Sequence, residues 1–180
     1  MPAVVGNECA AGIELTVAAA VPSGGAPLKL EEFLPYRLNV VASLTSQALS
    51  RVYAERYGMG IPEWRVLVTL GQFGTMTGKA VGAHSHMHKT KVSRAVALLE
   101  RRDLLARRAN EADMRESLLS LTPAGRAIYD ELAPGALEFG RRLMEVIDPV
   151  ARGPFERALA KLTHRSAQLV AELPKRDGAA

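Results

Sequence analysis

One segment, residues 77–125, constrains the fold of this chain more than any other. It opens with a threonine, a residue type that caps helices, before a short helical stretch over 77–84. A second helix is predicted over about 88–101, because apolar residues recur there at three- and four-residue steps. Two short runs of strand character follow, at 104–109 and 115–121, with turn residues between them. The segment therefore predicts two helices joined by a turn and followed by a β-hairpin.

The second helix has two chemically different faces. The apolar face, which is suited to packing on a core, carries Val92, Ala95, Val96 and Leu99. The other face carries His88, Lys89, Thr90, Lys91, Ser93 and Arg94. Cations near the N-terminus of a helix oppose its macrodipole unless an external anion balances them, and DNA phosphate is such an anion. We therefore interpret 88–101 as a recognition helix whose polar face lies against base edges and phosphates of a major groove. Taken alone, the pattern is equally compatible with the solvated face of an ordinary helix.

The predicted hairpin carries basic residues on both arms. Arg107 and Arg108 lie on the first arm, and Arg115 follows the turn. Arg115 is expected to reach into a minor groove, where a guanidinium gains from the negative potential between phosphates. Phosphate would repel Asp113, so we interpret this residue as an acceptor that orients arginine side chains. Together these elements form the pattern of a winged helix-turn-helix, a module that binds duplex DNA.

Basic charge is concentrated in this part of the chain. Residues 79–115 hold nine lysines and arginines against four acids, an excess of five positive charges. The formal net charge of all 180 residues is +4, so the rest of the chain is close to neutral. Such concentration is typical of a surface that binds a polyanion, and Lys79 joins the expected DNA contacts.

The sequence also resembles the multiple antibiotic resistance regulator (MarR) family. The resemblance spans roughly residues 28–173, and its most specific part is the D-x-R … L-T-x-x-G pattern of the wing. The segments that carry it are Pro62–Leu67, Lys91–Arg94, Leu98–Glu100, Asp113–Arg115 and Leu121–Arg126. The resemblance implies a homodimeric regulator, usually a repressor, that binds a palindromic operator and releases it when a small molecule binds.

The same resemblance implies a ligand crevice between the dimerisation helices and the winged domain. It would take small aromatic acids, phenols or their coenzyme A thioesters. Arg37 is suited to pairing with a carboxylate, while Tyr36 and Asn39 are suited to bonding a phenolic oxygen. Trp64 and Arg65 complete the expected site, with Trp64 stacking on the ligand. For these two the alternatives are a core position for Trp64 and a surface ion pair for Arg65.

We predict a mainly α-helical fold with a small β-wing, in which a winged helix-turn-helix is flanked by N- and C-terminal dimerisation helices. A hydrophobic content of 48% in 180 residues is sufficient for the core of one domain. The terminal helices carry more apolar residues than one winged domain covers, which favours pairing with a second copy. The predicted divisions are a flexible arm over 1–28, a domain over 29–173 with its winged part at about 61–121 and dimerisation helices at about 30–57 and 123–173, and a tail over 174–180.

Glycine and proline mark the predicted helix boundaries. Pro62 opens a helix that runs to about Gln72, and residues 74–76 are suited to a small strand beside the wing. Thr122-Pro123 starts a long helix, which Pro134-Gly135 is expected to kink. Gly153-Pro154 is expected to delay the last regular helix to Pro154.

Patterns of catalysis are weak or missing. Residues 74–80 come near a phosphate-binding loop, but the glycine spacing is one residue short and Ala80 stands where a hydroxyl must hold magnesium. There is no G-x-S-x-G elbow, and Cys9 has no fixed base beside it. The sequence thus predicts a regulator and not an enzyme, with no catalytic residue, cofactor or metal.

The cysteine count and the N-terminal segment bear on location. A single cysteine excludes an internal disulfide, which favours a reducing cytoplasm. Glu8 and Glu14 interrupt the apolar N-terminal run, which argues against a secretion signal. No segment approaches the roughly 20 uninterrupted apolar residues of a membrane span, so no membrane partner is expected.

Two other switches remain open beside a small-molecule effector. Cys9 is a candidate redox sensor. His84, His86 and His88 alternate along the turn between the two DNA-contacting helices, and imidazoles two residues apart can hold a transition metal. The alternative for these histidines is simple donation to phosphate.

Overall fold

A computed structural model describes residues 27–111 and 113–173 of the chain. The predicted arm lies outside this part except for its last two residues, and the predicted tail lies wholly outside it. Contacts divide the chain into two compact units, residues 1–39 and 40–180.

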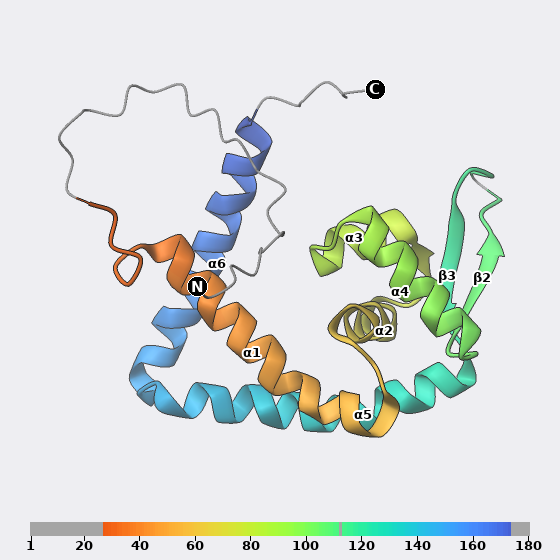
Figure 1. The fold of residues 1–180 in the computed structure, drawn as a ribbon, viewed down its shortest axis with the longest axis horizontal. Coiled ribbons are helices and arrows are strands. Elements are labelled where there is room, and N and C mark those ends of the chain that lie inside the picture. The colour runs from red at the N-terminus through yellow and green to blue at the C-terminus, as the bar shows by residue number, and fades with distance from the viewer. Residues whose placement is uncertain (1–26, 112, 174–180) are drawn as a thin grey trace, which may run out of the picture. The chain divides into compact units, whose positions relative to one another are not determined.

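Helices dominate the described residues, and a small antiparallel sheet lies beside one of them, in agreement with the predicted fold class (Figure 1). In chain order the elements are α1 (Leu34–Tyr57), α2 (Ile61–Phe73), β1 (Met76–Thr77), α3 (Gly78–Ser85), α4 (Lys89–Arg101), β2 (Leu105–Ala109), β3 (Ser117–Leu121), α5 (Pro123–Leu143), the 3-10 helix η1 (Met144–Val146) and α6 (Pro149–Glu172).

Local chemistry explains several helix ends. α1 stops before Gly58, whose φ of 56° lies in the left-handed region that favours glycine. At the start of α2, the Glu63 carboxylate accepts a hydrogen bond from the Gly60 amide at 2.8 Å. The hydroxyls of Thr77 and Thr122 cap α3 and α5, accepting from backbone amides three residues ahead at 3.2 and 3.0 Å. These caps lie where the sequence predicted them.

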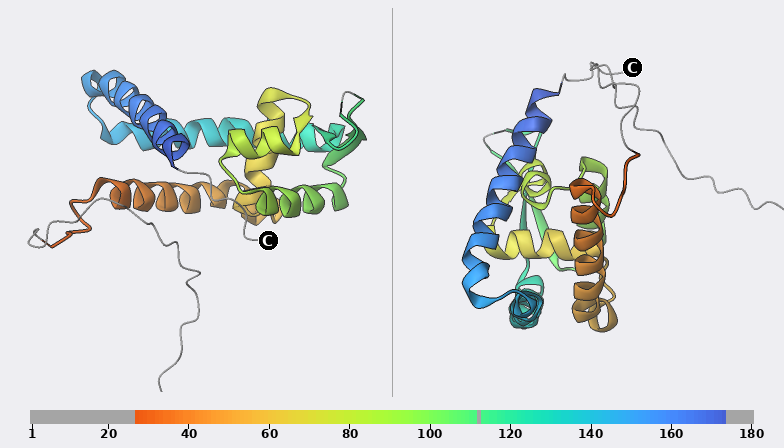
Figure 2. Two further views of the ribbon diagram at one scale, coloured as in Figure 1. Left: turned by 90° about the horizontal axis from the view of Figure 1, so that it is seen from above. Right: turned by 90° about the vertical axis from the view of Figure 1, so that its left-hand side faces the viewer.

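The start of the last helix was predicted wrongly. α6 begins at Pro149 and continues through Pro154. The Asp148 carboxylate accepts from the Val150 amide at 2.8 Å, and Pro149 has the backbone angle of a first helical residue. Pro154 lacks only one backbone donor, so this strong start outweighs it. Pro134 likewise lies inside α5 without ending it. After η1 the chain turns, and α6 leaves the end of α5 in a new direction (Figure 2).

The three strands form one antiparallel sheet in the order β1-β3-β2. Leu105 pairs with Leu121 and Ala109 with Ser117, so β2 and β3 form a regular hairpin. The predicted small strand exists as β1, in which Met76 pairs with Leu119. This pairing ties the segment before α3 to the hairpin.

The core lies between α2, α3, α4 and the sheet. All four residues predicted for the inner face of α4 are at most 3% exposed. They pack with Leu67 and Leu70 of α2 and with Val81 of α3, each of which is fully buried. Burying a valine or leucine side chain stabilises a fold by about 1.5–3 kcal/mol. The orientation of α4 is therefore set by packing.

Polar contacts join the end of α1 to α4 and α5. The Tyr57 hydroxyl donates to the Glu131 carboxylate of α5 at 2.6 Å, and Arg56 pairs with the same carboxylate. The hydrogen bond to Glu131 raises the pKa of Tyr57. Arg102, the C-cap residue of α4, donates to the backbone carbonyl of Tyr57. These contacts tie the end of α1 to both α5 and the end of α4.

Gly125 allows the start of α5 to pass close to the link between α4 and β2. A Cβ atom at this position would lie 2.0 Å from the carbonyl oxygen of Leu104. That oxygen also accepts a hydrogen bond from the Thr122 amide at 3.2 Å, so it is held in place. The backbone must move to admit any side chain.

We expect Gly125→Ala to lower the free energy of unfolding by about 2 kcal/mol or more, because the added methyl group meets backbone and not a flexible side chain. Urea unfolding followed by circular dichroism measures the change. Gly140→Ala in the same helix is the control, since nothing lies within 4 Å of its Cβ position. It should stabilise the protein by about 0.5–1 kcal/mol through helix propensity. Equal effects of the two substitutions would contradict this account.

Candidate nucleic-acid interface

A tight turn joins α3 to α4. His86 has a φ of 52°, and the Met87 amide donates to the Gly82 carbonyl at 3.1 Å. Gly82 lies close under this turn, because a Cβ there would be 3.2 Å from the Met87 oxygen. His88 then caps α4, its Nδ1 accepting from the Thr90 amide at 3.4 Å. The predicted helix-turn-helix is therefore present.

The residues predicted to contact DNA are all exposed. They are Lys79 on α3, His88, Lys89, Thr90, Lys91, Ser93 and Arg94 at the start and on the outer face of α4, and Arg107, Arg108 and Arg115 on the hairpin. Only the inner face of α4 is buried, so its basic residues are free to meet a partner from solvent.

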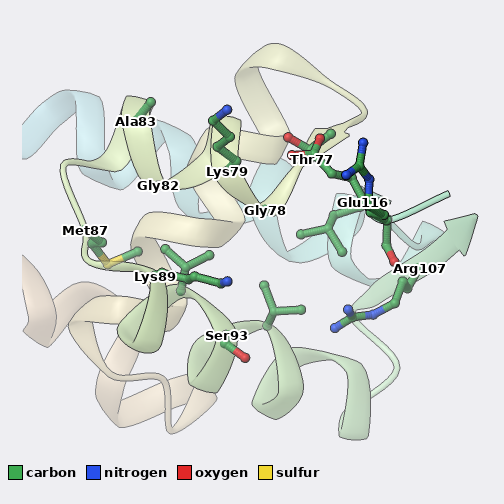
Figure 3. A pocket seen from close by; sticks show the side chains of 15 residues that line it. Thr77, Gly78, Lys79, Gly82, Ala83, Met87, Lys89, Ser93, Arg107 and Glu116 are labelled. Atoms are coloured by element: carbon green, nitrogen blue, oxygen red, sulfur yellow. The ribbon is translucent and has the colours of Figure 1, made fainter. Parts of the chain in front are cut away.

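Half of these residues surround one hollow, which we call the α4 cavity (Figure 3). It has a volume of about 650 Å³ and lies between α3, α4 and the hairpin. The predicted contacts that line it are Lys79, Lys89, Ser93, Arg107 and Arg115. Its floor is apolar, with Val92 and Val96 from α4 and Leu119 from β3. The other five predicted contacts do not line the cavity, so the structure does not bring all ten together there.

Arg107 has a partner that the sequence interpretation did not include. Its Nε and Nη2 atoms donate to the two carboxylate oxygens of Glu100 at 2.8 and 2.9 Å. The bidentate pair joins β2 to the last turn of α4. It lowers the pKa of Glu100 and raises that of Arg107. Glu100 lies in one of the segments that resemble the MarR family, but its distance of seven residues from Arg107 fits no local pairing rule.

The predicted contact between Asp113 and an arginine of the wing is present. The Asp113 Oδ1 atom accepts from the Arg115 backbone amide at 3.0 Å and from its Nε at 3.4 Å. The Arg115 side chain is nevertheless 93% exposed. Its remaining guanidinium donors point into solvent and are available to an acceptor.

The predicted ligand residues fall in two environments. Tyr36, Arg37 and Asn39 are exposed in the first two turns of α1, in the smaller unit. Trp64 belongs to the core of the larger unit, where its ring stacks on Tyr53 with centroids 4.8 Å apart. Burial raises the pKa of the Tyr53 hydroxyl. Arg65 is half-buried. The core alternative for Trp64 therefore holds, because one face of its ring is already covered by Tyr53.

The three histidines of the turn have separate surroundings. The His84 ring lies against Phe73 with centroids 4.3 Å apart, while His88 caps α4. Within residues 27–111 and 113–173, no three His, Cys, Asp or Glu side chains are placed to hold a metal ion together. Cys9 lies outside the described part of the chain.

The helices described here include none with the length and apolar character needed to cross a membrane.

Comparison with known proteins agrees with this geometry. The profile of the MarR family matches residues 57–116, from the end of α1 to the turn of the hairpin. A MarR-family transcriptional regulator from Silicibacter pomeroyi is 28% identical, with a TM-score of 0.64 over 74% of this chain and 90% of that one. Over residues 57–116 the chain thus has the sequence pattern of the MarR family, and its fold is similar to the winged helix-turn-helix fold of a MarR-family transcriptional regulator.

Two further solved structures are similar to this chain. A probable transcriptional regulator from Pseudomonas aeruginosa is 26% identical, with a TM-score of 0.61 over 74% of this chain and 99% of that one. BpsR from Bordetella bronchiseptica, whose DNA binding is regulated by 6-hydroxynicotinic acid, is 22% identical. Its TM-score is 0.68 over 77% of this chain and 98% of that one. No curated protein gave a significant match.

The pair between Glu100 and Arg107 should make stability depend on pH. The folded-state pKa of Glu100 is below its ordinary value near 4.5, so its contribution is present above that value and is lost as pH falls through the lowered pKa. We expect Glu100→Gln to destabilise the protein at pH 7 and to make progressively less difference toward pH 3. Urea unfolding across this pH range measures the difference in unfolding free energy between the wild-type protein and Glu100→Gln. In an Arg107→Gln background the difference should no longer shrink toward acid pH, and the same shrinkage there would contradict the assignment.

Proposed function

We propose that this protein is a transcriptional regulator of the MarR family, a homodimeric repressor that binds a palindromic operator and releases it when a small aromatic acid, phenol or aryl coenzyme A thioester binds. The observation that carries the proposal is the exposed basic face of α4 beside the α4 cavity, opposite a fully buried apolar face. In this arrangement α4 enters a major groove and the hairpin reaches the adjacent minor groove.

Each predicted contact has a role in this proposal. Lys91, Ser93 and Arg94 contact base edges from the first turns of α4. Lys79, Lys89 and Arg107 contact phosphates along the rim of the α4 cavity, and Arg115 enters the minor groove. His88, Thr90 and Arg108 contribute further backbone contacts. The ion pair with Glu100 leaves Arg107 with free donors, so it restrains this side chain without blocking it.

Exposed apolar side chains support a dimer. Along α6 these residues are Val150, Phe155, Leu159, Leu162, Leu169 and Val170, and along α1 they are Leu34, Leu38, Val41 and Leu44. No residue of α6 is buried. A helix of 24 residues whose apolar side chains face solvent needs a partner, and a second copy offers the matching surface. A two-fold pair also presents two recognition helices roughly 34 Å apart, one turn of DNA.

The effector is proposed to act through a population shift. Tyr36, Arg37 and Asn39 supply donors and acceptors for an aromatic carboxylate or phenol, with Arg65 beside the buried Trp64. The regulation of BpsR by 6-hydroxynicotinic acid, a small aromatic acid, is a precedent for this chemical class. Because contacts of Tyr57 tie α1 to both α5 and α4, a ligand that repositions α1 changes the spacing of the recognition helices.

The same fold also permits a redox or metal switch. Oxidation of Cys9, or metal binding by the histidines of the turn, would replace the organic effector. The separate environments of His84 and His88 favour the organic effector over a metal.

We expect Arg94→Ala to weaken specific operator binding about tenfold or more, as the loss of a base contact does. Arg101→Ala is the matched control, because it removes the same charge from the exposed surface of the last turn of the same helix. It should change affinity less than about threefold. Mobility-shift titration on a duplex selected by the wild-type protein, against random duplex, measures both. Equal losses, an absence of sequence preference at physiological ionic strength, or sedimentation as a monomer would contradict the proposal.

A thermal-shift screen of aromatic carboxylates, phenols and aryl coenzyme A thioesters should find compounds that raise the melting temperature of the protein. A ligand that binds only the folded state stabilises that state. A true effector should also release the selected duplex. Arg37→Gln should weaken the response to carboxylates about tenfold, while Arg51→Gln, which removes an exposed charge further along α1, should not. Cys9→Ser should leave the response unchanged. Release by peroxide that disappears in Cys9→Ser, without any aromatic hit, would instead support the redox switch.

A further inference from the structure

Backbone hydrogen bonds join described residues on the two sides of the wing turn. Asp113 donates its amide to the Asn110 carbonyl at 3.2 Å and accepts from the Glu116 amide at 2.9 Å. The Asn110 amide donates to the Glu116 carbonyl at 3.3 Å, which closes the turn. The side chain of Asp113 also contacts Arg115, and these contacts restrain Met114, which lies between the two residues. These backbone and side-chain hydrogen bonds hold the described residues of the turn.

Met114 stands at the tip of this closed turn and is 77% exposed. Hairpin turns are usually polar, and a large apolar side chain held in solvent gives no stability to the fold. Neither its exposure nor its place in the turn is explained by packing. The position is suited to burying an apolar side chain against a partner.

Charge alone does not explain how this tip approaches DNA. From residue 108 to 117 two arginines are accompanied by three acids, so the tip carries no net positive charge. One of these acids, Asp113, already contacts the Arg115 guanidinium. An apolar contact at the tip is a source of attraction that does not depend on this charge balance.

We propose that Met114 is a specificity-determining residue that packs against the floor of the minor groove and disfavours guanine at that position. This inference rests on the proposed binding of operator DNA. The minor-groove edge of a G·C pair carries the N2 amino group of guanine, whereas an A·T pair presents only acceptors and a flatter floor. A thioether side chain pressed on that amino group desolvates it without offering a good acceptor. Met114 thus responds to the shape of the minor-groove floor, whereas Arg115 beside it responds to the electrostatic potential of the groove.

Inosine separates this readout from any major-groove contact. An I·C pair presents the same major-groove edge as G·C but lacks the N2 amino group. We expect the wild-type protein to bind a selected duplex with I·C at the wing position about five- to tenfold more tightly than the same duplex with G·C. The position is located by hydroxyl-radical footprinting on the bound duplex, and affinities are measured by fluorescence anisotropy.

Met114→Ala should reduce the preference for I·C over G·C to about twofold or less. The slope of affinity against salt should not change, because no charge is lost. Met114→Leu should retain the preference, since an apolar body remains, whereas Met114→Gln should lose most of it. Arg115→Ala is the contrasting variant and should lower the salt slope by about one while keeping part of the preference. Unchanged melting temperatures show that the exposed substitutions leave the fold intact.

Two outcomes would overturn the inference, and they are distinguishable from failure of the proposed function. If Met114→Ala keeps the full wild-type preference, or if wild type does not distinguish I·C from G·C, Met114 does not read the minor groove. In either case the loss of binding in Arg94→Ala would still support operator recognition. If the wild-type protein shows no preference for any selected duplex, the proposed function itself fails.

Discussion

Burial of one face of α4 is the interaction on which the rest of this structure depends. Val92, Ala95, Val96 and Leu99 are removed from solvent against α2, α3 and the first residues of the sheet. Rotation of the helix would expose these side chains and bury lysines, at a cost of several kcal/mol. The same packing that stabilises the domain therefore holds the basic residues outward. Stability and the presentation of the DNA-facing surface have a single physical cause.

The hairpin is held to this helix by contacts of different kinds. Glu100 joins α4 to β2 through Arg107, while β1 joins the strand β3 to the segment before α3. Gly125 lets α5 begin directly beside the Leu104 carbonyl. Arg107 and Leu119, which take part in two of these contacts, also line the α4 cavity, so the contacts restrain its walls. A preformed surface lowers the entropic cost of association.

Lysine and arginine supply the positive charge of this surface, and acidic residues orient some of the arginine side chains. Two arginines of the wing have carboxylate partners, Glu100 for Arg107 and Asp113 for Arg115. Each pairing reduces net charge but limits the orientations of a long side chain. The wing consequently contributes oriented donors, and in our proposal an apolar tip, while α3 and α4 contribute most of the unpaired cations. The contacts at Tyr57 link this assembly to α1 and α5, where an effector and a partner subunit are proposed to act.

The sequence by itself determined the order of elements, the buried face of α4, the capping threonines and the role of Asp113 as an acceptor for wing arginines, because periodicity, capping and turn chemistry are local. Local rules failed at Pro154, where the Asp148 cap outweighed one missing donor. Only the tertiary structure decided that Trp64 stacks on Tyr53, that Glu100 holds Arg107, and that five of the ten predicted contacts share one cavity. These contacts join segments that are distant in sequence, or depend on a turn that brings the strands back beside a helix. The packing of the whole domain determines them, and residue spacing along the chain does not.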